Sequence, residues 1–426
     1  DILLLSSLRL KDKLFYGWVV VGTFFIVGIT LYGIHFSFGV FFESIEGEFN
    51  LNRAGTSAVL SANLLLAGIC SFFAGWALDK YGPRTIVFLM GLFAGMSLLL
   101  TSQTNSLWQL FITYSLLLSM GTGAVFVVPM STVSRWFDKK RGTALGITSS
   151  GVGLGMFVMA PFATYLISNY NWRIAYIVIG LIAWLIVIPL SGLLKRGPYE
   201  IGTLPDGAKS DLINLKSEKH RVQPQGLSVL QASRTRSFWL IMVIWVLFGS
   251  NIFLVMTHLV PHARDIGFSQ MEAATVLSII GGIAVGGRIL IGIASDRVGR
   301  KSMSVICALF QAGAMLWLIW AQELWSFYMF ALVYGFAFGG MVPAMAALIS
   351  DTFGLSRIGS IFGVLEIGFG VGAAIGPAIG GLIFDVSNSY VIAFSLGALV
   401  MSVVTLLIVL IKRETNRNNG GANVKS

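Results

Sequence analysis

One arginine lies inside a segment that otherwise has the composition of a membrane-spanning helix. The segment SIIGGIAVGGRILIGIAS runs from Ser278 to Ser295, and Arg288 is its single charged residue. A guanidinium stays protonated in proteins, and a charge at the centre of a bilayer costs from about 2.5 to about 17 kcal/mol. Arg288 therefore needs water, a partner or a ligand. Its helical face carries small residues, which admit a close-packed helix or a ligand: Gly281, Ala284, Gly292 and Ser295.

Two interpretations of Arg288 are open from the sequence. In the first, its guanidinium fork binds the carboxylate of a small ligand with two parallel hydrogen bonds, which strengthen where water is excluded. In the second, Arg288 is paired permanently with Glu366 or with backbone carbonyl groups. We favour the first, in which one arginine recognises one carboxylate.

Glu366 is the second charge that lies well inside an apolar run. It sits among glycines in GSIFGVLEIGFGVGAAIGP, nine residues beyond Arg357. A carboxyl group in such surroundings can take up and release a proton, which Arg288 cannot do. We predict that Glu366 carries any proton that moves with the ligand; the alternative is a carboxyl group that only holds helices together.

Two histidines are weaker candidates for proton transfer, because imidazole changes its charge near neutral pH. His35 lies in YGIHFSFGVFF, and a protonated His35 could also contact an anionic ligand. His258 follows Ser237 by 21 residues, about 31 Å along a helix, which places it at the outer interface of a membrane. A packing role, with the ring hydrogen-bonded to a neighbour, is open for both.

Further residues are predicted to line a ligand site near Arg288. Polar groups lie inside the apolar runs at Asn251, Tyr114 and Tyr334, although each could instead be hydrogen-bonded within its own part of the fold. Phe336 and Phe338 in GFAFGG would enclose the organic part of the ligand.

The elements that must position these residues are membrane helices. Of the 426 residues 56% are hydrophobic and 11% charged, whereas about a quarter are charged in soluble domains. Twelve apolar runs are long enough to cross a hydrocarbon core of about 30 Å, and alternating ten-residue segments typical of a membrane β-barrel are absent. The spans are approximately 16–42, 54–78, 85–103, 107–134, 143–168, 172–194, 237–263, 270–294, 302–321, 325–351, 358–384 and 388–411.

The net charge of +10 is distributed as in a membrane protein, which argues against nucleic acid as a partner. Of 29 Lys and Arg residues, 25 fall in the termini and in the connections after every second span. The opposite connections hold only Arg53, Arg173 and Arg264. The positive-inside rule then places both termini in the cytoplasm, with Arg288 about 10 Å from the cytoplasmic end of its helix if that helix ends near Ser295.

The chain is divided into two similar halves. We predict an N-terminal half at 1–194, a basic cytoplasmic linker at 195–236, a C-terminal half at 237–412 and a tail at 413–426. The loops GWALDKYGPR and GIASDRVGRK recur 217 positions apart, and Pro129 with Pro343, and Pro161 with Pro377, recur at nearly the same offset. Six helices duplicated in one orientation place a binding site near the midplane, between halves that rock around it.

The duplicated loop is predicted to act in that motion. Its glycines would turn the chain at a helix end, while its aspartates and basic residues form ion pairs in one state and break them in the other; charges that are merely solvated are the alternative. The residues concerned are Gly75, Asp79, Lys80, Gly82 and Arg84, with Gly292, Asp296, Arg297, Gly299 and Lys301.

The repeated loop resembles the signature of the major facilitator superfamily, over essentially the whole chain. The resemblance implies an all-α membrane protein with twelve helices in two six-helix halves, and it says little about the substrate.

Other stretches resemble the monocarboxylate transporter family, and we expect a bacterial member. They are YGWVVV, VFFESIEGEF, LDKYGPR, NWRIAYIVIG and GFAFGG. Arg288 falls where that family has its substrate-binding arginine, and GFAFG where an aromatic residue limits substrate size. Ala284 stands where animal members commonly have an Asp. Phe36, next to His35, stands where they have a lysine used in proton coupling. The family's helix 11 glutamate falls at Gly370, one turn from Glu366.

The expected function is secondary transport of a small monocarboxylate such as lactate or pyruvate, together with a proton, by alternating access. The expected location is the bacterial inner (plasma) membrane, with the lipid bilayer as partner and the chain as a monomer. The rival is an anion exchanger similar to the oxalate and formate carriers, although a dicarboxylate needs a second fixed cation that only a protonated His35 could supply.

A membrane enzyme or a non-transporting sensor is less favoured. A phosphate-binding G-x-x-x-x-G-K-[ST] loop is absent, and the linker and tails are too short for a signalling domain. GVGLG, at Gly151 to Gly155, is better explained by close helix packing than by dinucleotide binding. Cys70 and Cys307 stand apart in apolar runs, so neither a disulfide nor a metal site is predicted, and no cofactor is expected.

Overall fold

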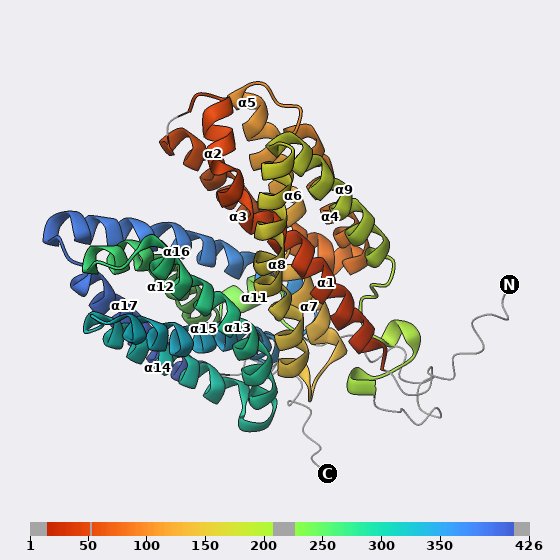
Figure 1. Ribbon diagram of the computed structural model, residues 1–426. Helices are drawn as coiled ribbons and strands as arrows, with labels where there is room; N and C mark the ends of the chain where they lie inside the picture. The colour runs from red at the N-terminus through yellow and green to blue at the C-terminus, as the bar shows by residue number, and fades with distance from the viewer. Residues whose placement is uncertain (1–14, 52, 208–225, 413–426) are drawn as a thin grey trace, which may run out of the picture.

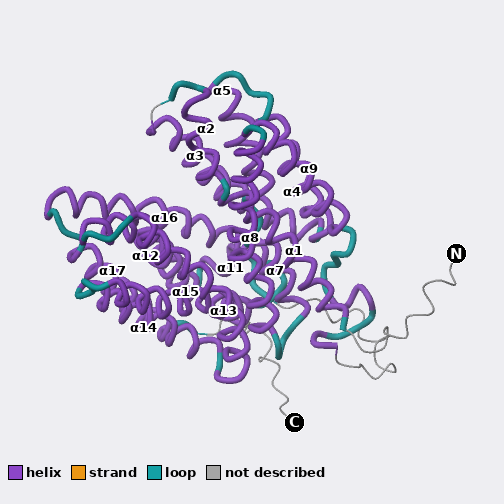
Figure 2. Tube along the Cα trace, in the orientation of Figure 1, coloured by secondary structure: helices purple, strands orange, loops and turns teal. Residues whose placement is uncertain are grey.

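The computed structural model describes residues 15–51, 53–207 and 226–412. Within them, twelve helical spans are long and apolar enough to cross a membrane, and each overlaps one of the twelve predicted from the sequence. Figure 2 shows helices joined by short loops, with no strand drawn in the described part of the chain. The predicted tail 413–426 and most of the linker, 208–225, lie outside the described residues.

The N-terminal half contains the first six spans, of which the first is formed by α1 and α2 and the fourth by four consecutive segments. Its elements are α1 (Tyr16–Phe36), α2 (Phe38–Glu48), α3 (Arg53–Tyr81), α4 (Pro83–Thr101), α5 (Leu107–Leu110), the π-helix η1 (Phe111–Leu117), α6 (Leu118–Thr122), α7 (Val127–Trp136), α8 (Arg141–Asn169) and α9 (Trp172–Ser191).

The linker and the C-terminal half follow. The linker contains the short 3-10 helices η2 (Pro198–Ile201) and η3 (Pro205–Gly207) and the helix α11 (Val229–Ser233). The C-terminal half consists of α12 (Arg236–Ile266), α13 (Gln270–Val298), α14 (Arg300–Ile319), α15 (Leu324–Phe353), α16 (Ile358–Ser387) and α17 (Val391–Leu410).

The two halves repeat one packing arrangement. Helix α1 packs on α8 as α12 packs on α16, and α4 packs on α9 as α14 packs on α17. Figure 1 shows two bundles that meet near α7, α8 and α13 and diverge away from that junction, and α1 begins on the junction side. The end of α17 lies on the same side, because Lys301 donates to the carbonyl groups of Val409 and Ile411 next to the junction. We call this side the terminal face and the other side the open face.

Small residues bring the halves together near the terminal face. The halves touch mainly through two helix pairs, α8 with α13 and α3 with α16. A Cβ atom on Gly146 would collide with the backbone carbonyl of Arg288, and one on Gly363 would lie 2.8 Å from the carbonyl of Ser71. Backbones can approach this closely only where side chains are missing.

Burial along α8 marks where the halves separate. Nearly all positions from Arg141 to Gly151 are buried or half-buried, whereas beyond Gly155 the buried positions form one stripe against α1, at Met159, Ala163 and Leu166. Helix α16 shows the same change, with a buried stripe at Gly368, Gly372, Gly376 and Gly380 against α12. The halves are therefore in contact at the terminal face and apart at the open face.

On the open face, one described ion pair stays within a half. Arg173 in α9 donates to the carboxylate of Glu48 at 2.8 Å. Hydrogen bonds from Arg173 and Trp172 hold the pKa of the Glu48 carboxyl below its usual value.

The fourth span is broken by its sequence. Pro129 has no N–H to donate to Val125, and the helix is interrupted at residues 123–126, between α6 and α7. The preceding π-helix leaves carbonyl groups of Tyr114 and Ser115 free to accept hydrogen bonds from the Asn63 side-chain amide. The break presents Phe126 to the C-terminal half.

We expect a side chain at Gly292 to force the halves apart, because a Cβ there would lie 2.5 Å from the carbonyl of Gly142. Overpacking costs about 1–3 kcal/mol, so Gly292→Val is expected to lower the midpoint of thermal unfolding in detergent by several degrees. Gly286→Val is the matched control, because no atom lies within 4 Å of the Cβ position of Gly286 in the same helix. Equal midpoints for the two variants would contradict this account of the interface.

Candidate functional site

Arg288 lies deeper in its helix than the sequence indicated. Helix α13 continues past Ser295 to Val298, so Arg288 is ten residues from the helix end, about 15 Å rather than about 10 Å. This distance is half the thickness of a hydrocarbon core of about 30 Å. Arg288 therefore lies well inside the candidate membrane span Met271–Val298.

The Arg288 side chain is buried at the boundary between the halves. It is 5% exposed, its Cζ lies 5.7 Å from the centre of the Phe338 ring, and its Nη1 lies 3.6 Å from the Cβ position of Gly153 in α8. Its Nε is buried without a hydrogen-bond partner, and in the described part of the chain no carboxylate forms an ion pair with it. The described residues thus leave the charge without a counter-ion.

Glycines of the GFAFGG segment bring Phe338 to Arg288. A Cβ on Gly335 would lie 2.7 Å from the carbonyl of Ile280, and Cβ atoms on Gly339 and Gly340 would collide with Ala284 and Ile291 of α13. Helices α13 and α15 are consequently in close contact along this stretch. The close packing places Phe338, predicted as a lining residue, over the guanidinium, while Phe336 contributes its backbone carbonyl next to Gly287.

Glu366 lies on the face of α16 that is turned towards the N-terminal half. It follows Gly359 and Gly363, which contact α3 of that half, by seven and three residues, and residues so spaced share a helical face. Trp245 of α12 belongs to the same aromatic cluster as Phe126, whose ring contacts Phe362 one turn before Glu366, and the Trp245 Nε1 is buried without a hydrogen-bond partner in the described residues. The described residues give Glu366 no ion pair, with Arg288 or any other cation.

Tyr32 of α1 connects the two charges electrostatically. Its phenol group interacts with both the carboxyl group of Glu366 and the guanidinium of Arg288. Tyr32 belongs to the N-terminal half and the two charges belong to the C-terminal half. The site therefore spans the boundary, and its charges depend on the position of one half relative to the other.

Aromatic rings form the apolar wall beside Glu366. Ring centres of Phe126 and Trp245 are 6.2 Å apart, those of Phe126 and Phe362 are 6.0 Å apart, and those of Trp245 and Phe248 are 6.1 Å apart. Phe126 reaches this wall from the break in the fourth span. The wall thus combines rings from both halves.

The two predicted histidines differ in their surroundings. His35 lies one turn beyond Tyr32 on α1, half-buried, with its Nδ1 lacking a hydrogen-bond partner in the described residues. His258 is 9% exposed, and its Nε2 lies 2.9 Å from the backbone oxygen of Pro377 within the C-terminal half. His258, which was predicted to lie at the outer interface, is thus a buried residue that contacts α16.

Three predicted polar residues lie within their own halves. Asn251 donates to the hydroxyl group of Tyr334 at 3.2 Å, and the Asn251 oxygen points towards Gly397 in α17. Tyr114 packs 4.9 Å from Phe38, ring centre to ring centre, inside the N-terminal half. None of the three has a described contact with Arg288.

The duplicated aspartates bind helix N-termini of the opposite half. Asp296 accepts hydrogen bonds from the backbone N–H groups of Gly142 and Thr143 at 2.7 and 2.8 Å. Asp79 accepts from those of Gly359 and Ser360 at 3.3 and 2.8 Å. Free N–H groups and the helix dipole favour a carboxylate at these positions, so both contacts stabilise the closed terminal face.

The other residues of the duplicated loop have several roles. Gly82 and Gly299 turn the chain with positive φ angles of 86° and 108°, as predicted for this loop, whereas Gly75 and Gly292 lie inside helices and permit close approach to the other half.

Of the basic residues in the second loop, Arg300 forms an ion pair within it, with Asp296 at 3.9 Å, whereas those named in the sequence analysis form no described pair with the loop aspartates. Lys80 lies over the rings of Trp76 and Tyr81, and Lys301 donates to the last carbonyl groups around α17. Arg84 and Arg297 have no described partner. The ion-pair partner of Asp79 is instead Arg135, at 2.6 Å.

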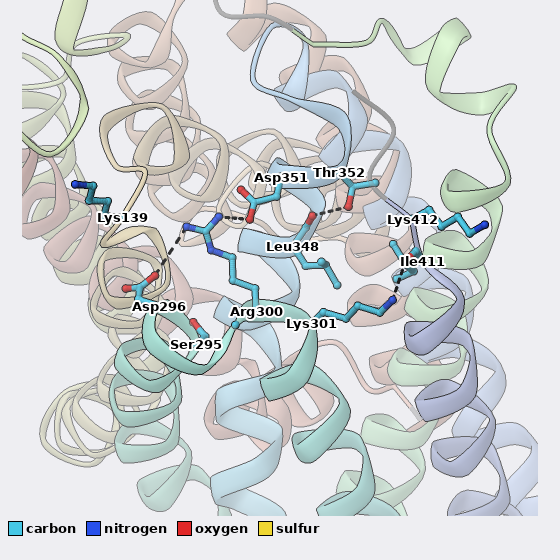
Figure 3. A pocket seen from close by; sticks show the side chains of 11 residues that line it. Lys139, Ser295, Asp296, Arg300, Lys301, Leu348, Asp351, Thr352, Ile411 and Lys412 are labelled. Atoms are coloured by element: carbon cyan, nitrogen blue, oxygen red, sulfur yellow. Dashed lines mark hydrogen bonds and ion pairs between the residues drawn. The ribbon is translucent and has the colours of Figure 1, made fainter. Parts of the chain in front are cut away.

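Asp351 is the centre of a second contact at the terminal face. It accepts from Arg141 of the N-terminal half and from Arg300 of its own half. Figure 3 shows Arg300 between Asp351 and Asp296 at a cavity of about 640 Å³, with Lys139 and Lys412 at its edges. The charges at the centre of this cavity are already paired, so it belongs to the closed gate.

Tyr32, Trp245, Asp351 and Arg135 are site and gate residues that the sequence analysis missed. Tyr32 and Trp245 lie in apolar runs where an aromatic side chain is ordinary. Asp351 could have been found from the repeat, because it stands 216 positions after Arg135. A cation in one half and an anion at the matching position of the other indicate partners in a charge network.

The fold and the site define a membrane transporter with two halves around a central site. The family model of the Major Facilitator Superfamily matches residues 23–310 and 287–425. The chain belongs to this superfamily, as predicted from its repeated loop.

Relatives with curated names are monocarboxylate transporters of animals. The chain is 27% identical over 381 residues to monocarboxylate transporter 13 of Rattus norvegicus, covering 89% of this chain and 85% of the relative. It is 27% identical over 425 residues to monocarboxylate transporter 12-B of Danio rerio, covering 95% and 89%.

Solved structures of transporters share the fold. The proton:xylose symporter XylE superposes with a TM-score of 0.76 at 14% identity, covering 94% of this chain and 97% of that one. FucP in its outward conformation has a TM-score of 0.70 at 13% identity, covering 91% and 98%.

Removing one carboxylate is expected to loosen the terminal face. A hydrogen bond to a charged group contributes about 1.5–3 kcal/mol, and Asp296→Asn removes this charge. Ser350, 1% exposed beside Ser134 of the other half, can be replaced by Cys in a chain without Cys70 and Cys307. We expect a water-soluble maleimide to label Ser350→Cys several-fold faster when Asp296→Asn is added.

The matched control is Asp385→Asn, which removes an exposed carboxylate at the open face. Labelling that accelerates equally with this control, or that is unchanged by Asp296→Asn, would show that Asp296 does not hold the halves together.

Proposed function

We propose that the chain transports small monocarboxylates of the lactate or pyruvate type together with a proton, by alternating access in the plasma membrane with both termini in the cytoplasm. The observation that carries the proposal is the buried Arg288 guanidinium, which has no counter-ion among the described residues. A desolvated guanidinium binds a carboxylate strongly and with defined geometry. The names of the curated relatives agree with this substrate class.

The transport cycle follows from the position of the charge between the halves. With the terminal face closed by Asp79, Asp296 and Asp351, the site is reached from the open face, which is the outer side if the termini are cytoplasmic. The anion binds Arg288 and neutralises it, so the open ends of the halves can close over the site without burying an unpaired charge. Closure then favours release of the terminal-face contacts, and the site opens to the cytoplasm.

Glu366 is the proposed proton carrier. Its carboxyl group, unlike Arg288, exists in a charged and a neutral form, and Tyr32 lies in electrostatic reach of both side chains. A proton on Glu366 leaves the site with one positive charge, which the monocarboxylate neutralises. His35 on the same helix as Tyr32 is the second candidate.

The alternative of a carboxylate exchanger needs a further cation for a dicarboxylate. Arg288 is the only Lys or Arg near the midplane of the described helices, and a protonated His35 would have to serve. A membrane enzyme or a sensor has less support, because the same features all suit transport.

Arg288→Ala is expected to reduce uptake of labelled lactate into proteoliposomes to background, because the variant removes the carboxylate receptor. Arg288→Lys keeps the charge without the planar fork, and we expect at least a tenfold lower apparent affinity. Arg264→Ala removes an exposed arginine at the far end of α12 and serves as the control. Unchanged uptake by Arg288→Ala would assign a structural role to the arginine.

Glu366→Gln is expected to abolish the acceleration of uptake by an inward proton gradient, because an amide cannot exchange a proton. Exchange of labelled for unlabelled lactate at equal pH should persist, since it needs no net proton movement. The measurement compares both assays for Glu366→Gln, His35→Ala and the unmodified chain. A gradient effect that survives Glu366→Gln but not His35→Ala would assign the proton to His35.

A further inference from the structure

Two opposite charges of the site are each left without a partner. The site as described holds one guanidinium, Arg288, and one carboxyl group, Glu366, and neither is ion-paired with the other or with a third residue of the described chain. A simple monocarboxylate compensates Arg288 alone. Glu366 must then be neutralised separately, by a proton.

The surroundings of the carboxyl suit a cationic group as well as a proton. Glu366 lies one helical turn after Phe362 on α16, and Phe362, Phe126, Trp245 and Phe248 form a continuous wall of rings. Aromatic faces attract ammonium groups, more strongly when water is excluded. In the described residues, no lysine or arginine lies over a ring of this wall.

Two neighbours of the guanidinium carry no acidic group. Gly153 faces Arg288 without a side chain, and Ala284 one turn before it is apolar and 1% exposed. The anionic end of a ligand can therefore approach Arg288 without repulsion from a neighbouring acid. The Phe338 ring covers the guanidinium on a further side.

We propose that the site also accepts a zwitterion, whose carboxylate binds Arg288 and whose ammonium group binds Glu366 and the rings around Trp245. The proposal rests on the proposed function, because it uses Arg288 in the same role. The ammonium group takes the place of the coupled proton, so both fixed charges are compensated by one molecule. Because Arg288 and Glu366 are not within ion-pair distance of each other in the described structure, the ligand needs a spacer between its two ends, as in an ω-amino acid.

The test compares pairs of ligands that differ in one terminal group. The pairs are 3-aminopropanoate with butyrate, 4-aminobutyrate with pentanoate, and 5-aminopentanoate with hexanoate; in each pair an ammonium group replaces a methyl group on a chain of equal length. Binding is read from the rise in the thermal unfolding midpoint of the purified full chain in detergent, because a ligand that binds the native state stabilises it. This readout does not require transport.

We expect at least one amino acid of the series to bind the unmodified chain about tenfold more tightly than its alkanoate partner. In Glu366→Gln the order should reverse, because the ammonium group loses its carboxylate while the alkanoate keeps Arg288. Asp385→Asn, which removes an exposed carboxylate at the open face, should preserve the original order. Alkanoate binding by Glu366→Gln shows that this variant is folded.

The outcomes separate the two proposals. Alkanoates that bind through Arg288, with no amino acid binding more tightly at any length, would overturn the zwitterion proposal and leave the proposed function in place. A preference for amino acids that persists in Glu366→Gln would also overturn it, because another group would then bind the ammonium. If neither series stabilises the chain and lactate is not taken up, both proposals are wrong.

Discussion

The unpaired guanidinium of Arg288 is the constraint on which the rest of this molecule depends. A permanent charge near the midplane is unfavourable in lipid, so α13 must keep it against protein, and the small residues of α8 and α15 allow this by close packing. The same packing keeps the guanidinium at the boundary of the halves, without a counter-ion among the described residues. The close packing of α13 against α8 and α15 therefore underlies both the burial of this charge and its proposed use in binding.

The halves are held together at the terminal face by contacts that differ in kind from those of the site. Asp79 and Asp296 each bind backbone N–H groups of the other half, and these bonds can be exchanged for water when the face opens. Arg288 of the site, by contrast, is 5% exposed and has no counter-ion among the described residues with which such an exchange could be made. In the proposed transport cycle, the occupancy of the site therefore decides, together with the gate, which arrangement of the halves is favoured.

Much of the fold could be predicted from the sequence, because the length of each apolar run and the internal repeat are patterns to which many residues contribute. Twelve spans, the duplicated loop and the packing role of GVGLG were predicted, and Gly151 and Gly155 do contact α1. Arg288 and Phe338 were both predicted as residues of one site, and they lie together in the structure. Asn251 and Tyr334 were predicted to line the same site, but they are hydrogen-bonded to each other. Polar groups inside apolar runs have several possible partners, and only the rotation of each helix decides between them.

The duplication is broken at the position that matters most for binding. Ser71 stands 217 positions before Arg288, and its carbonyl meets Gly363 as that of Arg288 meets Gly146. The backbone contacts of the two interfaces are thus equivalent. The interface of α3 with α16 carries the small hydroxyl group of Ser71, whereas that of α13 with α8 carries the guanidinium of Arg288. Because both charges belong to the C-terminal half and Tyr32 and Gly153 to the N-terminal half, the rocking motion of the proposed cycle would change which residues face the charges. A symmetric site would lack this coupling between binding and motion.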